Sequence, residues 1–306
     1  MKNIPLFDSH SDTVHVARKK GRGLRENDVH LDFLRSAEYQ PRGQVFSVWG
    51  EPRRDPIMFD VVMDYWEKEI AANSDLVVHC RSAADIRAAQ AEGKIAALLS
   101  IEGAEQIECS TERLQAAYDR GIRIIHPCWN YDNALTGSAT EGQGGLTEEG
   151  RRFVTEAQRL GIVLDMSHIS EKAFWEVAEM TSRPILAGHS DSRAVWDNPR
   201  NLTDEQFLAL KQLGGVAGLN LSPKFIGGKN DIEAVVDHAE HFLSIGGEKN
   251  VGLGTDLDGV TALPAGLNGV QDFDKLYEAM LRRNWSEEIV RGIFFDNLND
   301  FFQRAL

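Results

Sequence analysis

The 306-residue sequence predicts an α/β fold, a (β/α)8 barrel of the TIM type with loop insertions and C-terminal helices. Short apolar segments alternate eight times with longer amphipathic segments, as parallel strands and their crossover helices do. The apolar segments are rich in Val, Ile and Leu, which is typical of strands buried on both faces. A closed barrel takes about 250 residues, so this length fits one barrel. We therefore expect a single domain spanning residues 1–306.

The expected strands share this apolar composition, with few polar residues before their ends. In chain order they cover residues 4–10, 44–49, 95–102, 122–126, 162–167, 184–189, 215–220 and 251–256. The segments between them place apolar residues at helical spacing. The expected helices cover residues 59–73, 83–92, 112–120, 148–160, 171–180, 204–213, 232–245, 273–283 and 287–304.

Local signals mark the ends of several helices and the functional loops. Thr203 and Gln206 have the spacing of a capping box, and Ser286 is a candidate cap of the last helix. Glycines that follow helical segments are typical C-terminal stops; they are Gly121, Gly161 and Gly214. Three loops are expected at the C-terminal mouth of the barrel, where barrels carry their sites. They cover residues 18–42, which include one short helix, 132–145 and 264–269.

Charge and composition exclude several classes of partner. The net charge is −14 and the pI is near 5.1, so the surface repels nucleic acid and anionic membranes. No run of 18 apolar residues is present, and the N-terminus lacks the apolar core of a signal peptide. The three cysteines are sparse and fit reduced thiols. We expect a cytoplasmic protein without a membrane or nucleic-acid partner; a homodimer is left open.

Polar side chains gather at the C-terminal ends of the expected strands. Strand ends in a barrel bring distant sequence positions to one mouth, so these side chains are expected to meet. The residues are His10, Asp12, Glu102, His168, His189, Asp256 and Asp258. A lone buried histidine is more often a hydrogen-bonded core residue, and a lone strand-end carboxylate often caps a helix. Their shared position along the predicted strands favours a metal site over these separate explanations.

The donor set predicts two divalent ions. His10 and Asp12 are two apart on an extended segment, so both side chains point toward one ion. His168 and His189 arrive from neighbouring strands and reach a second ion. Glu102 has two carboxylate oxygens and can bridge both. Imidazole and carboxylate ligands suit zinc, and two ions about 3.5–4 Å apart share a hydroxide and polarise a scissile carbonyl. The remaining histidines are expected to have surface or packing roles; they are His15, His30, His79, His238 and His241.

Five stretches resemble the membrane dipeptidase (renal dipeptidase) family of the amidohydrolase superfamily. The order of the D-x-S-H-x-S and following S-H-type blocks is specific to that family, and the resemblance runs from end to end. The stretches are FDSHSDT (7–13), LLSIEGAEQI (98–107), GLTEEGRRFVTEAQRLGIVLDMSHIS (145–170), PILAGHSDSRAVWDNPRNLTDEQ (184–206) and GLGTDLDG (252–259).

The resemblance implies roles for individual residues. It assigns His10 and Asp12 to one zinc, His168 and His189 to the other, and Glu102 to both. Arg200 matches the arginine that holds the terminal carboxylate of the substrate. Asp256 matches the aspartate that hydrogen-bonds the bridging hydroxide and carries its proton, with Asp258 as the alternative.

One position departs from the family pattern. Many members have a histidine after the fourth strand that contacts the substrate carbonyl, and this position falls on Trp129. His126 lies three residues earlier with opposite strand parity, which favours a side chain that faces the helices. Three groups are candidates for the contact with the substrate carbonyl: the metal, Asn130 as a substrate-binding residue, or a displaced His126.

The resemblance implies a metal-dependent dipeptidase whose substrate carries a free C-terminal carboxylate. The bridging hydroxide attacks the carbonyl, Asp256 returns the proton to the leaving amine, and Arg200 grips the carboxylate. Two alternatives stay open. One is hydrolysis of an N-acyl amino acid or a lactam, which also places a carboxylate near a carbonyl. The other is a metal-binding protein without turnover.

Overall fold

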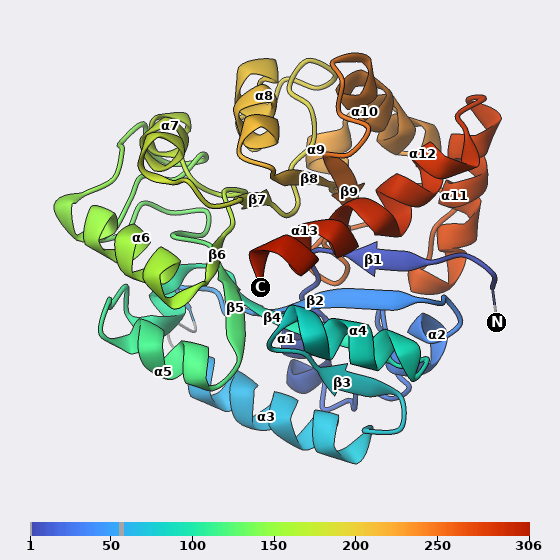
Figure 1. The fold of residues 1–306 in the computed structure, drawn as a ribbon, viewed down its shortest axis with the longest axis horizontal. Coiled ribbons are helices and arrows are strands. Elements are labelled where there is room, and N and C mark those ends of the chain that lie inside the picture. Colours follow the sequence, from blue (N-terminus) through green and yellow to red (C-terminus); the bar gives the residue numbers. More distant parts are fainter. Residues whose placement is uncertain (1, 55–57) are drawn as a thin grey trace.

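The computed structural model describes residues 2–54 and 58–306. Its strands form one parallel sheet that curls into a nearly closed barrel with helices around the outside (Figure 1). The neighbour order is β6-β5-β4-β2-β1-β9-β8-β7. A parallel bridge between Asp165 and Leu186 joins the two ends of this order, next to β6 and β7. The predicted (β/α)8 barrel is confirmed.

The barrel strands lie where the apolar segments predicted them, but most are shorter than those segments. Their bounds are β1 Leu6–Asp8, β2 Arg42–Val48, β4 Ile95–Ile101, β5 Ile122–Ile125, β6 Val163–Leu164, β7 Leu186–Ala187, β8 Val216–Leu219 and β9 Val251–Leu253. The shortening comes mostly at the C-terminal ends, where the chain leaves the sheet and turns into the mouth. A further strand, β3 Val77–His79, was not predicted and pairs with the first half of β4.

The helices that surround the barrel also follow the predicted segments. Their bounds are α1 Thr13–Lys19, α2 Phe33–Ser36, α3 Phe59–Ala72, α4 Ala83–Ala91, α5 Arg113–Asp119, α6 Glu148–Leu160, α7 Glu171–Met180, α8 Asp204–Gln212, α9 Pro223–Ile226, α10 Ile232–Ser244, α11 Phe273–Arg282, α12 Glu287–Arg291 and α13 Asn297–Ala305. The short helices η1 Ala104–Ile107 and η2 Val270–Asp272 lie in loops. The predicted continuous last helix is interrupted by a π-helical turn, η3 Gly292–Asp296.

The predicted helix signals have the expected geometry. The Thr203 side chain accepts from the backbone of Gln206, whose own side chain bonds back, so the capping box is confirmed. The Ser286 side chain caps α12 by accepting a hydrogen bond from the backbone N–H of Ile289. α1 and α9 were not predicted; α9 has only four residues, too few to show a helical period. α2 is the one short helix expected between residues 18 and 42.

Alternate residues of each strand enter two different cores. In β4, Ala96 and Leu98 face the barrel interior, whereas Ile95, Ala97 and Leu99 pack against the outer helices. Two-residue periodicity therefore points Glu102, just past the end of β4, into the barrel.

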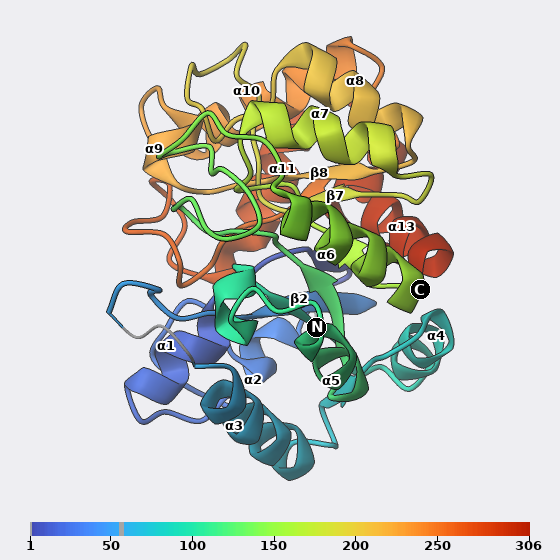
Figure 2. The ribbon, with the colours of Figure 1, turned by 90° about the vertical axis from the view of Figure 1, so that its left-hand side faces the viewer.

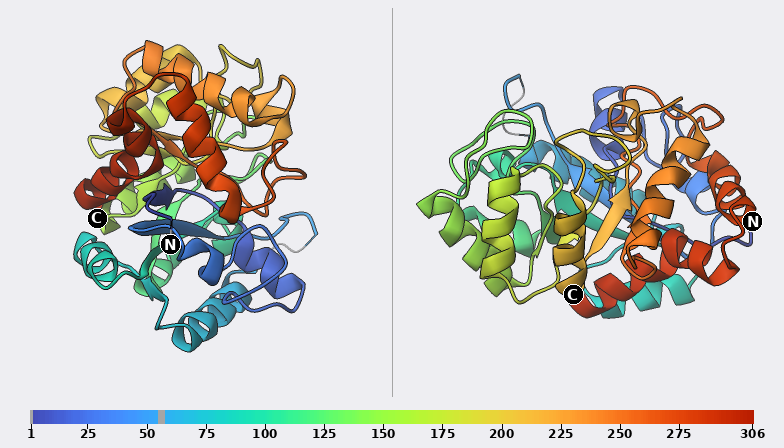
Figure 3. Two further views of the ribbon diagram at one scale, coloured as in Figure 1. Left: turned by 90° about the vertical axis from the view of Figure 1, so that its right-hand side faces the viewer. Right: turned by 90° about the horizontal axis from the view of Figure 1, so that it is seen from above.

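The interior core is completed by α13, which lies across the N-terminal end of the barrel (Figures 1 and 3). Phe302 of α13 stacks on Phe7 of β1 with ring centroids 5.2 Å apart. Long loops and α9 lie at the opposite end, where the strands end (Figure 2). The barrel is thus closed at the N-terminal end of its strands and open at the C-terminal end, where the polar side chains gather. Among the described residues, no helix combines the length and apolarity that a membrane span needs.

Candidate metal centre and its pocket

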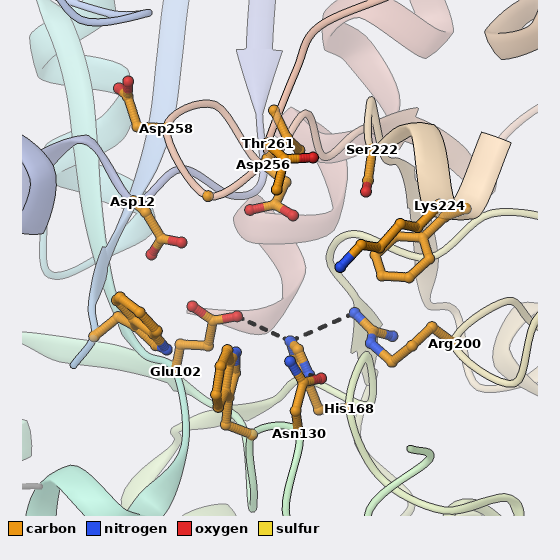
Figure 4. A pocket seen from close by; sticks show the side chains of 15 residues that line it. Asp12, Glu102, Asn130, His168, Arg200, Ser222, Lys224, Asp256, Asp258 and Thr261 are labelled. Carbon is orange, nitrogen blue, oxygen red and sulfur yellow. Dashed lines mark hydrogen bonds and ion pairs between the residues drawn. The ribbon is translucent and has the colours of Figure 1, made fainter. Parts of the chain in front are cut away.

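A cavity of about 290 Å³ opens at the C-terminal mouth of the barrel (Figure 4). Its lining combines carboxylates, imidazole, two cations and aromatic rings from loops after different strands. The residues are Asp12, Trp49, Glu102, Trp129, Asn130, His168, Arg200, Ser222, Lys224, Phe225, Asp256, Asp258, Gly259, Val260 and Thr261. The predicted site residues in this lining therefore meet in one small space.

The first candidate metal group consists of His10, Asp12 and Glu102. The Nε2 atom of His10 lies 3.5 Å from Oε2 of Glu102 and 4.0 Å from Oδ1 of Asp12. All three side chains are buried, and their ligand atoms lie within 4.8 Å of one another. The group matches the first half of the predicted donor set.

The second group consists of Glu102, His168 and His189. The Nε2 atom of His168 lies 2.8 Å from Oε1 of Glu102 and 2.9 Å from Nε2 of His189. Oε1 of Glu102 is also 3.5 Å from Nε2 of His189. The two oxygens of Glu102 therefore face the two groups separately, as a bridging carboxylate requires.

The electrostatics of these groups fit a cation. Asp12, Glu102 and Asp256 bring three carboxylates into a buried space, and uncompensated buried charge is costly. Burial alone would lower the pKa of His10, but Glu102 and then Asp12 raise it to about 10, so the cluster attracts positive charge. Several buried polar atoms lack a hydrogen-bond partner among the described residues; they include both ring nitrogens of His10, Oδ1 of Asp12 and Oε2 of Glu102.

The two histidines of the second group are held in the neutral form that binds metal. Burial and then the nearby Arg200 lower the pKa of His168 to about 3. Burial and then His10 hold the pKa of His189 well below its usual value. A neutral imidazole keeps a free lone pair, so both rings are ready ligands for a divalent ion.

The two aspartates of the TDLDG segment have different surroundings. Oδ1 of Asp256 lies 4.0 Å from Nε2 of His10, and its Oδ2 accepts a hydrogen bond of 3.2 Å from Asn220. Burial raises the pKa of Asp256 to about 6. Asp258 instead accepts from Thr13 at 2.5 Å and from the backbone of His30 at 2.8 Å, so both its oxygens are engaged. This geometry favours Asp256 as the proton carrier.

Arg200 reaches the pocket from the loop after β7. It is 3% exposed, and its Nη2 lies 3.4 Å from Nε2 of His168 (Figure 4). Its Nε and Nη1 are buried with no hydrogen-bond partner among residues 2–54 and 58–306. Burial lowers the pKa of this guanidinium. A buried guanidinium with two unpartnered nitrogens beside the metal groups can bind an anionic group of a ligand.

Asn130 contacts a candidate metal ligand. The Nδ1 atom of His168 lies 3.0 Å from Oδ1 of Asn130, which leaves Nε2 to face Glu102. This contact orients the imidazole, as outer partners of metal-bound histidines do. The predicted contact of Asn130 with substrate stays a prediction.

His126 faces the barrel interior, so the expectation that it faces the helices was wrong. Its Nε2 lies 3.0 Å from Oδ2 of Asp165 and its Nδ1 lies 3.1 Å from the carbonyl of Ile101. Ile124 belongs to the interior core, and His126 follows it by two residues. The error arose because Trp129 lies beyond the end of β5, where strand parity no longer applies. Nε2 of His126 makes no hydrogen bond with the described residues, and His126 forms a further candidate metal group with His10 and His189. Trp129 lines the pocket.

Several residues that line the pocket were not predicted, and three of them bear on its chemistry. Gly259 packs against the carboxylates, since an added Cβ would lie 2.1 Å from Oδ1 of Asp256 and 2.4 Å from Oδ2 of Asp12. Trp49 lines the pocket with its indole N–H buried and unpartnered within the described chain. Lys224, on α9, lines the wall that carries Arg200. Of these three residues, only Gly259 had a sequence signal, because it directly follows the predicted site residue Asp258.

Comparisons with known proteins agree with this geometry. The family model described as membrane dipeptidase (peptidase family M19) matches residues 1–305. A protein of Klebsiella pneumoniae, described as an uncharacterized protein in the pqqA 5′ region, is 32% identical over 256 residues, covering 77% of this chain and 94% of its own.

Solved structures are similar over almost the whole chain. The structure described as dipeptidase AC, a metallopeptidase of family M19, has a TM-score of 0.88 and 29% identity, covering 99% of each chain. A metallopeptidase from Rhodobacter sphaeroides, solved with a phosphinate mimic of the dipeptide L-Ala-D-Ala, has a TM-score of 0.88 and 28% identity, covering 100% of each chain. An amidohydrolase from Pseudomonas aeruginosa has a TM-score of 0.83 and 25% identity, covering 99% of this chain and 96% of its own.

Proposed function

The chain belongs to the membrane dipeptidase family, peptidase family M19, and on this basis we propose that it is a binuclear zinc dipeptidase. Its substrates are dipeptides with a free C-terminal carboxylate. The observation that carries the proposal is the position of Arg200, whose buried guanidinium stands beside the candidate metal groups with two nitrogens unpartnered among the described residues. The Rhodobacter sphaeroides relative, solved with a dipeptide mimic, supports the same substrate class.

His10, Asp12 and Glu102 would hold one divalent ion, and Glu102, His168 and His189 the other. When bound, two such ions supply an activated water and Lewis-acid polarisation of the scissile carbonyl. The imidazole and carboxylate donors favour zinc among the common divalent ions.

Asp256 moves the proton in the proposed reaction. The carboxylate accepts a proton from the attacking water as its oxygen bonds to the carbonyl carbon. It then donates this proton to the departing nitrogen as the C–N bond breaks. Burial raises the pKa of Asp256 to about 6, which suits a group that both takes and returns a proton near neutral pH.

Arg200 sets the length of the substrate. A guanidinium binds a carboxylate through two parallel hydrogen bonds, from Nη2 together with either Nε or Nη1. In Arg200, Nε and Nη1 have no hydrogen-bond partner among the described residues, and Nη2 lies at the long distance of 3.4 Å from Nε2 of His168. Since the guanidinium stands close to His168, only a carboxylate near the scissile bond reaches both Arg200 and the metal groups. A dipeptide meets this condition, whereas a longer peptide places its carboxylate farther away.

N-acyl amino acids and lactams meet the same condition, so substrate assays must separate these classes. The test is hydrolysis of a dipeptide panel, an N-acyl amino acid and a carboxylated lactam by the purified protein, with and without chelator. We expect dipeptide hydrolysis that chelator abolishes and zinc restores. Cleavage of the other classes alone would overturn the dipeptidase assignment, and no turnover with metal bound would support a binding protein. The cytoplasmic location stays a prediction from sequence.

A further inference from the structure

Lys224 is a second cation in the pocket that the proposed reaction does not use. It lies on α9, and its ammonium points into the cavity beside Arg200 (Figure 4). Its backbone carbonyl accepts a hydrogen bond from Asn198, but its Nζ has no hydrogen bond or ion pair within the described residues. The protein has a net charge of −14, and a lysine ammonium without a partner that faces a ligand cavity would attract an anionic group of a ligand.

The loop that carries Arg200 is tied to the segment that carries Lys224. Asn198 accepts from the backbone N–H of Arg200 at 2.9 Å and donates to the carbonyl of Lys224 at 3.0 Å. Asn201 donates to the carbonyl of Phe225 at 2.9 Å, and the Arg200 guanidinium lies 5.2 Å from the Phe225 ring. The two segments that carry the cations are therefore held together on one wall of the cavity.

The two cations differ in depth. Arg200 is buried at 3% exposure beside the metal groups, whereas Lys224 is exposed at the rim of the cavity. The deep guanidinium already offers two free donors to the α-carboxylate of a substrate. The side chain of the same C-terminal residue starts one atom from that carboxylate, and Lys224 lines the same cavity as Arg200, so an acidic side chain bound there would have a cation available.

We propose that Lys224 selects dipeptides whose C-terminal residue is acidic, by pairing its ammonium with the side-chain carboxylate. This inference rests on the proposed dipeptidase function and names the substrate class within it. Lys224 is then a specificity-determining residue, because the pair favours aspartate and glutamate over residues of the same shape without charge. A cation at the rim also attracts the additional negative charge of such substrates before they enter.

The test compares matched substrates that differ only in the side-chain charge. We measure kcat/KM for Ala-Glu against Ala-Gln and for Ala-Asp against Ala-Asn, at low ionic strength. The native enzyme is expected to prefer each acid by about two- to fivefold, the range of an ion pair with a solvent-exposed lysine. In Lys224→Met the ratio is expected to fall close to one, and Lys224→Arg should retain most of it.

Lys229→Met is the matched control, because Lys229 is an exposed lysine on the same segment outside the cavity; it should keep the native ratio. A native ratio close to one would overturn the inference, as would a preference that persists in Lys224→Met. Hydrolysis of Ala-Gln separates the two proposals. If Ala-Gln is cleaved without preference for Ala-Glu, only the role of Lys224 fails. If no dipeptide is cleaved, the proposed function and this inference fail together.

Discussion

Oδ1 of Asn130 lies 3.0 Å from Nδ1 of His168, on the side of the imidazole ring that faces away from Glu102. The amide oxygen is placed to accept a hydrogen bond from Nδ1–H, and this tautomer of His168 keeps the Nε2 lone pair for a metal ion. Asn130 is thus a positioning residue for a ligand, and its effect should appear first in metal affinity.

Asn130→Ala is expected to weaken zinc binding about 10- to 100-fold, the usual effect of losing such a partner. Asn130→Asp keeps an oxygen acceptor at this position and should retain most of the affinity. The measurement is zinc dissociation in competition with a chromophoric chelator. Equal affinities of the native protein and Asn130→Ala would show that the contact does not orient His168.

Metal content tests the two ligand groups directly. The native protein, purified without chelator, should contain two divalent ions per chain by elemental analysis. Glu102→Gln should lose at least one, because Glu102 is the shared member of both groups. His241→Asn, which changes a histidine far from the ligand groups, should retain both. A native stoichiometry well below one that added zinc does not restore would contradict the assignment.

Asp256→Asn should lower kcat about 100-fold or more, on the scale of general acid–base catalysis. Metal content should change little, since Asp256 belongs to neither ligand group. Asp258→Asn is the comparison, because it removes a charge two residues away from Asp256. The two carboxylate oxygens of Asp258 already accept hydrogen bonds from Thr13 and His30. A large loss of kcat in Asp258→Asn without one in Asp256→Asn would reverse the assignment of the two aspartates.

Arg200→Ala should reduce kcat/KM for a dipeptide by about 30- to several-thousand-fold, equivalent to roughly 2–5 kcal/mol for a truncated, desolvated charge pair. Arg200→Lys should recover only part, because an ammonium lacks the planar fork. The native enzyme should also cleave a C-terminally amidated dipeptide poorly, and Arg200→Ala should no longer distinguish amide from acid. Equal kcat/KM for acid and amide in the native enzyme would rule out the clamp.

Gly259→Ala should displace the carboxylates of Asp12 and Asp256, because the added Cβ would lie within 2.4 Å of both. We expect weaker zinc binding and a fall in kcat/KM of about tenfold or more, since small displacements in a catalytic site are costly. Gly144→Ala is the control, because the nearest atoms to its added Cβ are 3.9 Å away. Native zinc affinity and activity in Gly259→Ala would contradict this prediction, because they would show that the backbone at residue 259 can shift without displacing the two carboxylates.

The ligand groups were predictable because strand ends follow simple rules. A barrel collects the C-terminal ends of its strands, and two-residue periodicity sets which side chains point inward. Glu102 illustrates both, since it follows the inward-facing Ala96 and Leu98 of β4. Asp256 was also placed correctly at the mouth, although β9 ends three residues before it.

The remaining features depend on tertiary contacts that leave little trace in the sequence. β3 is three residues long and pairs with only half of β4, and the apolar run at residues 76–78 is too short to indicate a strand. α9 is four residues long, and nothing in its composition shows that Lys224 faces the cavity. His126 was misplaced because its parity was counted from Trp129, beyond the strand, instead of from Ile124.

The position of α13 across the lower end of the barrel has a consequence for biosynthesis. Phe7 belongs to β1, the first barrel strand, yet its aromatic partner Phe302 is synthesised only after β9, the last barrel strand. A ribosome-bound nascent chain therefore displays the apolar interior of the barrel until α13 emerges. The barrel cannot mature progressively from its N-terminus, and premature termination before α13 should yield an aggregation-prone product that depends on chaperones.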